Sequence, residues 1–132
     1  MTKKILIVED NVNNRLMLHD LLTHHGYQVL EAENGEEGLE LARKQQPDLI
    51  LMDIQMPVMD GVAVAKLLKE QPATSHLKII ALTSFAMKGD REKLLAAGFN
   101  DYVAKPINTR QLPRIIQWHL TPKEGDLSPF EE

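Results

Sequence analysis

The chain alternates five times between a short apolar segment and a segment whose apolar residues recur at helical spacing. The apolar segments span residues 5–8, 28–32, 49–53, 77–82 and 101–104. Glycine or proline follows the first four helical segments, at Gly26, Pro47, Pro72 and Gly98, and favours the end of a helix there. Apolar strands that alternate with helices are typical of a parallel sheet covered by helices on both faces. We therefore predict an α/β doubly wound fold, whose strand order the periodicity leaves open.

Length and charge limit how the chain is organised. Its 132 residues suit one domain with a sizeable core, which we place at residues 1–120. Residues 121–132 hold Lys123 and four acids, a net charge of −3 out of −4 for the whole chain, so the domain itself is close to neutral. We predict that this acidic C-terminal tail is flexible. Because the domain has no basic stripe, we do not expect it to bind nucleic acid.

Cysteine and long apolar segments are both missing from the sequence. Without cysteine the chain forms no disulfide and no thiolate metal site, as suits a reducing compartment. The apolar segment 5–8 is too short for the core of a signal peptide, and no later segment has the length to span a membrane. These features predict a soluble, cytoplasmic protein with no membrane contact.

Polar residues stand at the ends of four predicted strands. Glu9 and Asp10 end the first strand, Asp53 ends the third, Thr83 ends the fourth and Lys105 follows the fifth. Taken singly, each has an ordinary role, such as helix capping for the acids or a surface position for the lysine. Because open α/β sheets bind ligands beyond the carboxyl ends of their strands, their arrival at one edge indicates a functional site.

The charges of this group require a further cation or raised pKa values. Two carboxylates about 4 Å apart repel by roughly 4 kcal/mol at an effective dielectric constant of about 20. Lys105 offsets one of the three negative charges of Glu9, Asp10 and Asp53. Oxygen ligands without nearby histidine or cysteine favour Mg²⁺, or Mn²⁺, over zinc. Such a site suits phosphoryl transfer to a carboxylate, with Asp53 as the nucleophile and the Thr83 hydroxyl bonding the phosphoryl oxygens.

Four segments carry a resemblance to a known family. VEDN at 8–11, MDIQMPVMDG at 52–61, ALT at 81–83 and DYVAKP at 101–106 together resemble the motifs of bacterial response-regulator receiver domains. The resemblance extends in order from about residue 3 to residue 120. It implies a flavodoxin-like (βα)5 fold with strand order 2-1-3-4-5.

The resemblance also implies a role for each acid. Asp53 matches the phosphoacceptor and Asp10 a direct ligand of Mg²⁺. Glu9, where many relatives have aspartate, matches an acid that reaches the metal through water. The backbone carbonyl of Gln55 matches the third protein ligand, so that the implied metal site comprises Glu9, Asp10, Asp53 and Gln55. A receiver of this kind catalyses only its own phosphorylation and dephosphorylation and is not an enzyme for other substrates.

Three further residues match groups that act with the phosphoryl group. Lys105 matches a catalytic lysine that is followed by a cis peptide to a proline, here Pro106. Thr83 and Tyr102 match a switch pair: after phosphorylation the Thr83 hydroxyl turns towards the phosphoryl group and the Tyr102 ring rotates inward. This change is expected to reshape the face made by the fourth helix, the fifth strand and the fifth helix, where a downstream protein partner binds.

Asn11, and the neighbouring pair Asn14 and Arg15, are typical of hybrid-kinase receivers and of single-domain, DivK-like regulators. Because no output domain follows Leu120, we expect a stand-alone receiver, a monomer or weak dimer. Its phosphoryl group would come from a sensor histidine kinase or a histidine phosphotransfer protein. We also expect Phe85, just beyond the fourth strand, to shield the aspartyl-phosphate and slow its hydrolysis.

Two alternatives are open. One is a receiver fragment of a hybrid histidine kinase, although Met1 favours a complete protein. The other is a metal-dependent phosphatase with the same aspartyl chemistry. The phosphatase is disfavoured, since it would have a second acid two residues after its nucleophile, where Gln55 stands. No P-loop or dinucleotide glycine pattern supports a nucleotide-binding protein.

Overall fold

The computed structural model describes residues 2–56, 59–84 and 89–121. They form one sheet of five parallel strands, β1 (Lys4–Val8), β2 (Gln28–Ala32), β3 (Leu49–Asp53), β4 (Lys78–Thr83) and β5 (Asp101–Ala104). The helices of the same residues are α1 (Val12–His24), α2 (Gly35–Gln45), α3 (Gly61–Glu70), α4 (Asp90–Ala97) and α5 (Gln111–Leu120). None of these helices is both long and apolar enough to cross a membrane. The predictions for Phe85 and for the tail at 122–132 lie outside the described residues.

The order of the strands is β2-β1-β3-β4-β5, which confirms the doubly wound, flavodoxin-like fold. In this order the chain reverses its direction across the sheet after β2, so β1 and β3 flank a topological switch point. Ligands of such sheets bind outside the carboxyl ends of the strands at this point. The register sets Val8 of β1 opposite Met52 of β3, so the residues that follow begin at the same edge.

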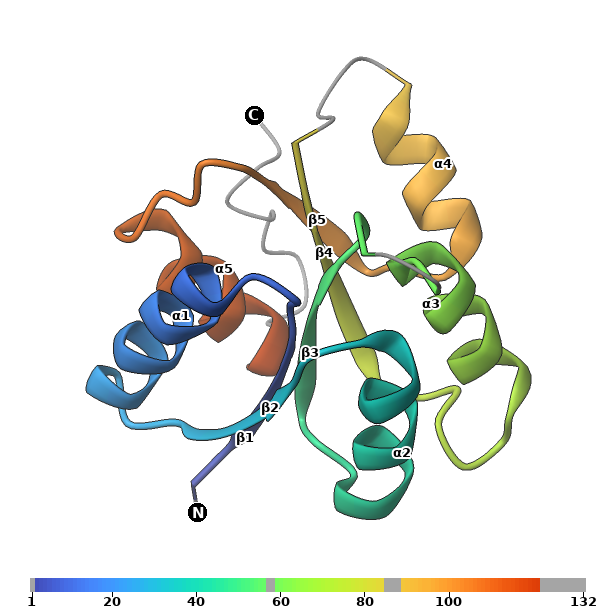
Figure 1. The fold of residues 1–132 in the computed structure, drawn as a ribbon, viewed down its shortest axis with the longest axis horizontal. Helices are drawn as coiled ribbons and strands as arrows, with labels where there is room; N and C mark the ends of the chain where they lie inside the picture. Colours follow the sequence, from blue (N-terminus) through green and yellow to red (C-terminus); the bar gives the residue numbers. More distant parts are fainter. Residues whose placement is uncertain (1, 57–58, 85–88, 122–132) are drawn as a thin grey trace.

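Two apolar clusters hold the helices against opposite faces of the sheet (Figure 1). Helices α1 and α5 cover the face that buries Ile5, Ile7, Leu49, Leu51, Ile80 and Leu82. Helices α2, α3 and α4 cover the face that buries Leu6, Val8, Ile50, Met52, Ile79 and Ala81. Because successive strand residues point to opposite faces, every position of a central strand must be apolar. Asp53 is the exception: β3 is buried at all five positions, and its last position is this acid.

Side-chain caps begin α1 and α3, two of the helices that start at the carboxyl edge. The side chain of Asn11 accepts a hydrogen bond from the backbone N–H of Asn14 (3.0 Å) at the start of α1. Asp60 caps α3 in the same way, at 2.9 Å. These caps satisfy N–H groups that have no partner within the helix. After α1, Gly26 takes the left-handed φ of +88° that ends the helix as predicted, since glycine adopts it without strain.

Strand β4 begins one residue later than the apolar pattern indicated. Leu77 donates its backbone N–H to the carbonyl of Thr74 (3.1 Å) and so belongs to the turn before the strand. Lys78 is the first residue in register with β3, opposite Leu49. The strand ends at Thr83, as predicted.

A buried pair of side chains ties the last turn of α5 to the start of β5. Nε2 of His119 lies 2.8 Å from Oδ2 of Asp101, and the side chains are 9% and 4% exposed. The ammonium of Lys78 also donates to the backbone carbonyl of His119. Helical and strand periodicity did not indicate this pair, because its members belong to different elements. It anchors α5 at the amino end of the sheet, opposite the predicted site.

We predict that His119→Phe lowers the free energy of unfolding by about 1.5–3 kcal/mol, because Asp101 stays buried after its hydrogen-bond partner is lost. Urea denaturation measures the change. The control is Lys44→Met, which removes the exposed pair of Lys44 and Glu40 at a similar distance, 2.7 Å, and should lower the stability much less. Equal decreases in the free energy of unfolding of the two variants would contradict the claim that the buried pair contributes more than the exposed one.

Candidate functional site

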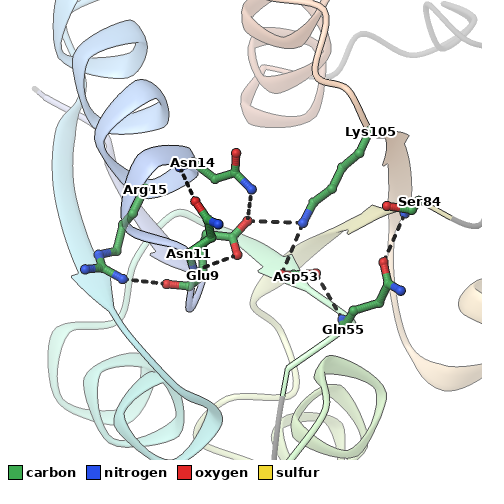
Figure 2. A network of polar contacts seen from close by, with 8 residues as sticks. All are labelled: Glu9, Asn11, Asn14, Arg15, Asp53, Gln55, Ser84 and Lys105. Carbon is green, nitrogen blue, oxygen red and sulfur yellow. Dashed lines mark hydrogen bonds and ion pairs between the residues drawn. The ribbon is translucent and has the colours of Figure 1, made fainter.

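The acids and the lysine predicted from the strand ends meet at the carboxyl edge of the sheet. Figure 2 shows three of them, Glu9, Asp53 and Lys105. Glu9 and Asp10 follow β1, Asp53 ends β3 and Lys105 follows β5. Carboxylate oxygens of Glu9, Asp10 and Asp53 all lie within 4.8 Å of one another. Glu9 and Asp53 are only 0% and 2% exposed, whereas Asp10 is exposed. The sheet produces this cluster because β1 and β3 end side by side in register.

Lys105 bridges the two buried acids. Its Nζ lies 3.2 Å from Oε1 of Glu9 and 3.2 Å from Oδ2 of Asp53. Its backbone N–H is donated to the carbonyl of Thr83 (2.8 Å), which fixes the start of the loop after β5. The lysine therefore supplies one positive charge to two buried carboxyl groups, with the exposed third acid beside them.

The environment raises the pKa of Glu9 to about 7. Burial is the main cause, and the hydrogen bond and charge of Asp53 act in the same direction. The backbone N–H of Asn11 and the charge of Lys105 oppose the rise. Burial by itself would lower the pKa of Lys105, but the charges of Glu9 and Asp53 outweigh it and raise that pKa. The cluster thus carries more negative charge than one lysine offsets, and this excess fits a divalent cation.

Gln55 connects the loops that follow β3 and β4. Its backbone N–H donates to Oδ1 of Asp53 (3.0 Å), and its side-chain oxygen accepts from the backbone N–H of Ser84 (3.4 Å). Each oxygen of the Asp53 carboxylate therefore has a donor, Gln55 on one and Lys105 on the other. Gln55 is exposed at the rim of the site. The role of its backbone carbonyl as a metal ligand stays a prediction.

Thr83 and Tyr102 lie on the neighbouring strands β4 and β5. Thr83 is fully buried and is paired with Ala104, while Tyr102 is half-buried and is paired with Ala81. Thr83 lies two residues after Ala81 and therefore on the same face of the sheet. Tyr102 is paired with Ala81, so both side chains lie on the face covered by α4. The Tyr102 ring packs against the apolar cluster there. The two residues lie on one face of the sheet, and their role as a switch pair stays a prediction.

Two residues of α1 belong to the site, although the sequence indicated only a subfamily resemblance for them. Nδ2 of Asn14 donates to Oε1 of Glu9 (3.4 Å), and Nη1 of Arg15 donates to the backbone carbonyl of Glu9 (2.8 Å). Their spacing from Glu9 was the available signal. A helix that begins directly after a strand turns some of its first polar residues back towards the strand end.

A cavity of about 470 Å³ lies beside Lys105. It is lined by Asn14, Met17, Ser84, Lys105, Pro106, Ile107 and Thr109. The peptide between Lys105 and Pro106 is cis, as expected. The cavity therefore places a recess next to the lysine, between α1 and the loop after β5.

Comparison with known sequences agrees with this geometry. Residues 5–117 match the model of the response regulator receiver domain. The chain is 45% identical over 117 residues to the polar-differentiation response regulator DivK of Brucella ovis, which covers 89% of this chain and 93% of that protein.

Solved receiver structures share the fold. The receiver domain of the sensor histidine kinase PA1611 from Pseudomonas aeruginosa, with a magnesium ion coordinated in its active-site cleft, is 39% identical, with a TM-score of 0.83 over 91% of this chain and 98% of that chain. The complex of the Saccharomyces cerevisiae histidine phosphotransfer protein Ypd1 with the receiver domain of Ssk1 gives 32% identity and a TM-score of 0.78, over 86% of this chain and 85% of the matched chain. With the family match over most of its length, this chain belongs to the response-regulator receiver family of two-component signalling.

Proposed function

We propose that this chain is a stand-alone receiver that accepts a phosphoryl group on Asp53 and signals by phosphorylation-dependent binding of a partner protein. The position of Asp53 carries the proposal. Its carboxylate is 2% exposed at the end of β3, with Oδ2 3.2 Å from Nζ of Lys105. A carboxylate with a counter-charge beside it, at the ligand-binding edge of the sheet, is placed to act as a nucleophile.

The proposed phosphodonor is a phosphohistidine of a sensor histidine kinase or of a histidine phosphotransfer protein. A carboxylate oxygen of Asp53 forms a bond to phosphorus, while the P–N bond of the donor breaks and its electron pair passes to the imidazole nitrogen. Lys105 lies beside the acid and offsets the charge that gathers on the phosphoryl oxygens. The hydroxyl of Thr83 would donate a hydrogen bond to one of these oxygens.

We propose Mg²⁺ as the metal of the site, with Mn²⁺ as a substitute. Glu9, Asp10, Asp53 and the backbone carbonyl of Gln55 would hold it. The clustered carboxylate oxygens, within 4.8 Å of one another, suit a hard cation that prefers oxygen ligands. When bound, the metal offsets the negative charge of the incoming phosphoryl group. The magnesium ion in the similar receiver of PA1611 supports this assignment.

The donor protein is proposed to approach over the start of α1. Val12 and Leu16, one helical turn apart, are 56% and 54% exposed. They lie on the helix that, through Asn14 and Met17, also lines the cavity next to Lys105. The complex of Ypd1 with the Ssk1 receiver shows that a similar receiver binds a phosphotransfer protein.

The downstream partner is proposed to bind the face made by α4, β5 and α5. Rearrangement of Thr83 and Tyr102 after phosphorylation would change this face, and Leu95 of α4, 41% exposed, is an apolar residue available for contact. We further propose that the receiver domain comprises residues 1–120 and acts in the cytoplasm as a monomer or weak dimer.

A second candidate is the receiver of a hybrid histidine kinase. The 39% identity to the receiver domain of the sensor kinase PA1611 favours it. In that case the receiver would be one domain of a longer kinase polypeptide, which would also carry the donor histidine or pass the phosphoryl group on to another protein. The chemistry at Asp53 would be the same.

We predict that incubation with a small-molecule phosphodonor and Mg²⁺ adds one phosphoryl group, measured by intact mass spectrometry. Asp53→Asn should abolish the adduct because it removes the nucleophile. Asp20→Asn, at an exposed acid of α1, is the matched control and should leave the adduct unchanged. An adduct that persists in Asp53→Asn would overturn the assignment of the phosphoacceptor.

We predict that Glu9→Gln stabilises the metal-free protein at pH 8 by on the order of 1–3 kcal/mol and much less at pH 5. The pKa of Glu9 is raised from 4.5 to about 7, so between these values the folded state binds more protons than the unfolded state. Stability from this group is therefore lost as the pH rises through that window. Urea denaturation in EDTA measures the difference between the variant and the wild type.

The control for this prediction is Glu70→Gln, at an exposed acid of α3. It should show no comparable difference between pH 5 and pH 8. Added Mg²⁺ should stabilise the wild type at pH 8, because it binds the folded state, and should stabilise Glu9→Gln less. A Glu9→Gln variant with the same pH dependence as the wild type would contradict the raised pKa.

A further inference from the structure

The adjacent residues Asn14 and Arg15 hold Glu9 at two different places (Figure 2). Asn14 donates to the side-chain oxygen Oε1 (3.4 Å), and Arg15 donates to the backbone carbonyl (2.8 Å). The other groups of Glu9 are engaged as well, since Oε2 accepts from the backbone N–H of Asn11 (3.2 Å) and its own N–H is donated to Ala32 (3.1 Å). Helix α1 is thus linked directly to both the main chain and the side chain of this acid.

Arg15 is itself held by two acids from another part of the sheet. Its side chain is 11% exposed, with Nε 3.5 Å from Glu31 and Nη2 3.3 Å from Glu33. Glu31 lies on β2, and Glu33 follows that strand. Nδ1 of His19 lies 3.1 Å from the second oxygen of Glu31. The guanidinium therefore spans α1, β2 and the end of β1.

The geometry of this contact requires arginine. A guanidinium offers donors in a fixed planar fork, so two nitrogens can meet Glu31 and Glu33 while the third points at the carbonyl of Glu9. The single ammonium of a lysine has no such fork. A lysine at this position would keep the charge but would not keep all three contacts.

We infer that Arg15, assisted by Asn14, is a positioning residue that fixes the peptide between Glu9 and Asp10 and thereby the oxygen ligands of the metal. Asp10 is exposed, so its place depends strongly on the peptide that precedes it. Repulsion among three acids tends to spread them apart, and the bond of Arg15 to the Glu9 carbonyl opposes this movement. Mg²⁺ demands near-ideal geometry, which makes its affinity sensitive to such outer contacts. The inference rests on the proposed function of the site.

Affinity for the metal separates positioning from a simple effect of charge. Arg15 is a cation near the metal site, so loss of its charge by itself would strengthen binding of a divalent cation. Loss of positioning would weaken that binding. The two effects have opposite signs.

The experiment measures Mn²⁺ affinity of the full chain by electron paramagnetic resonance and Mg²⁺ affinity by titration calorimetry. Arg15→Lys, which keeps the charge, is expected to weaken binding about tenfold, as loss of outer contacts to metal ligands does. Arg15→Gln should also weaken binding, but less, because loss of the charge acts in the opposite direction. Asn14→Ala should cause a smaller loss in the same direction. The matched control is Glu33→Gln, which removes one contact of Arg15 but leaves its bond to Glu9, and it should retain affinity near that of the wild type.

Phosphorylation gives a second readout. At saturating Mg²⁺ the phosphorylation rate of Arg15→Lys should return towards that of the wild type. The variant lowers the affinity for the metal, and saturation fills the site in spite of that loss. Unfolding in urea confirms that each variant is folded. Unchanged or tighter binding in both Arg15 variants would overturn the inference while leaving the proposed function intact. A wild-type chain that binds neither metal would overturn both.

Discussion

The bridge from Lys105 to Glu9 and Asp53 is the contact around which the site is built. One ammonium lies 3.2 Å from each of two carboxyl groups that are almost fully buried. Buried carboxylates whose oxygens lie within 4.8 Å of one another, as here, repel each other strongly unless a cation lies between them. The bridge forms only if β1, β3 and β5 end at the same edge of the sheet, which the parallel order β2-β1-β3-β4-β5 provides. Two apolar clusters on the faces of the sheet keep those strand ends in place.

The same charges link stability to the proposed function. Burial, together with the hydrogen bond and charge of Asp53, raises the pKa of Glu9 to about 7. Above that pH the metal-free protein is therefore less stable than it would be with a neutral residue there. A divalent cation and a phosphoryl group can both exploit this arrangement of charges. Residues placed for function commonly reduce stability in this way. The contacts of Asn14 and Arg15 with Glu9 then hold the acids together against their own repulsion.

Much of the site could be predicted from the sequence because parallel strands bring their carboxyl ends to one edge. Glu9, Asp10, Asp53 and Lys105 were identified from this rule and from the charges. The strand order came from the family resemblance, since the periodicity of apolar residues is the same for any order. The pair of Asp101 and His119 was missed, because nothing in either element alone indicates that their side chains meet.

The sequence by itself determined the alternation of strands and helices, the two-sided burial of the central strands and the residues that stand at their ends. These depend on local spacing, which is readable along the chain. Only the tertiary structure decided which oxygen of Asp53 faces Lys105, which atom of Glu9 receives Arg15, and how far the pKa of Glu9 rises. These depend on distances between side chains from different elements and on exclusion of water, and both arise only when the sheet and its helices pack together.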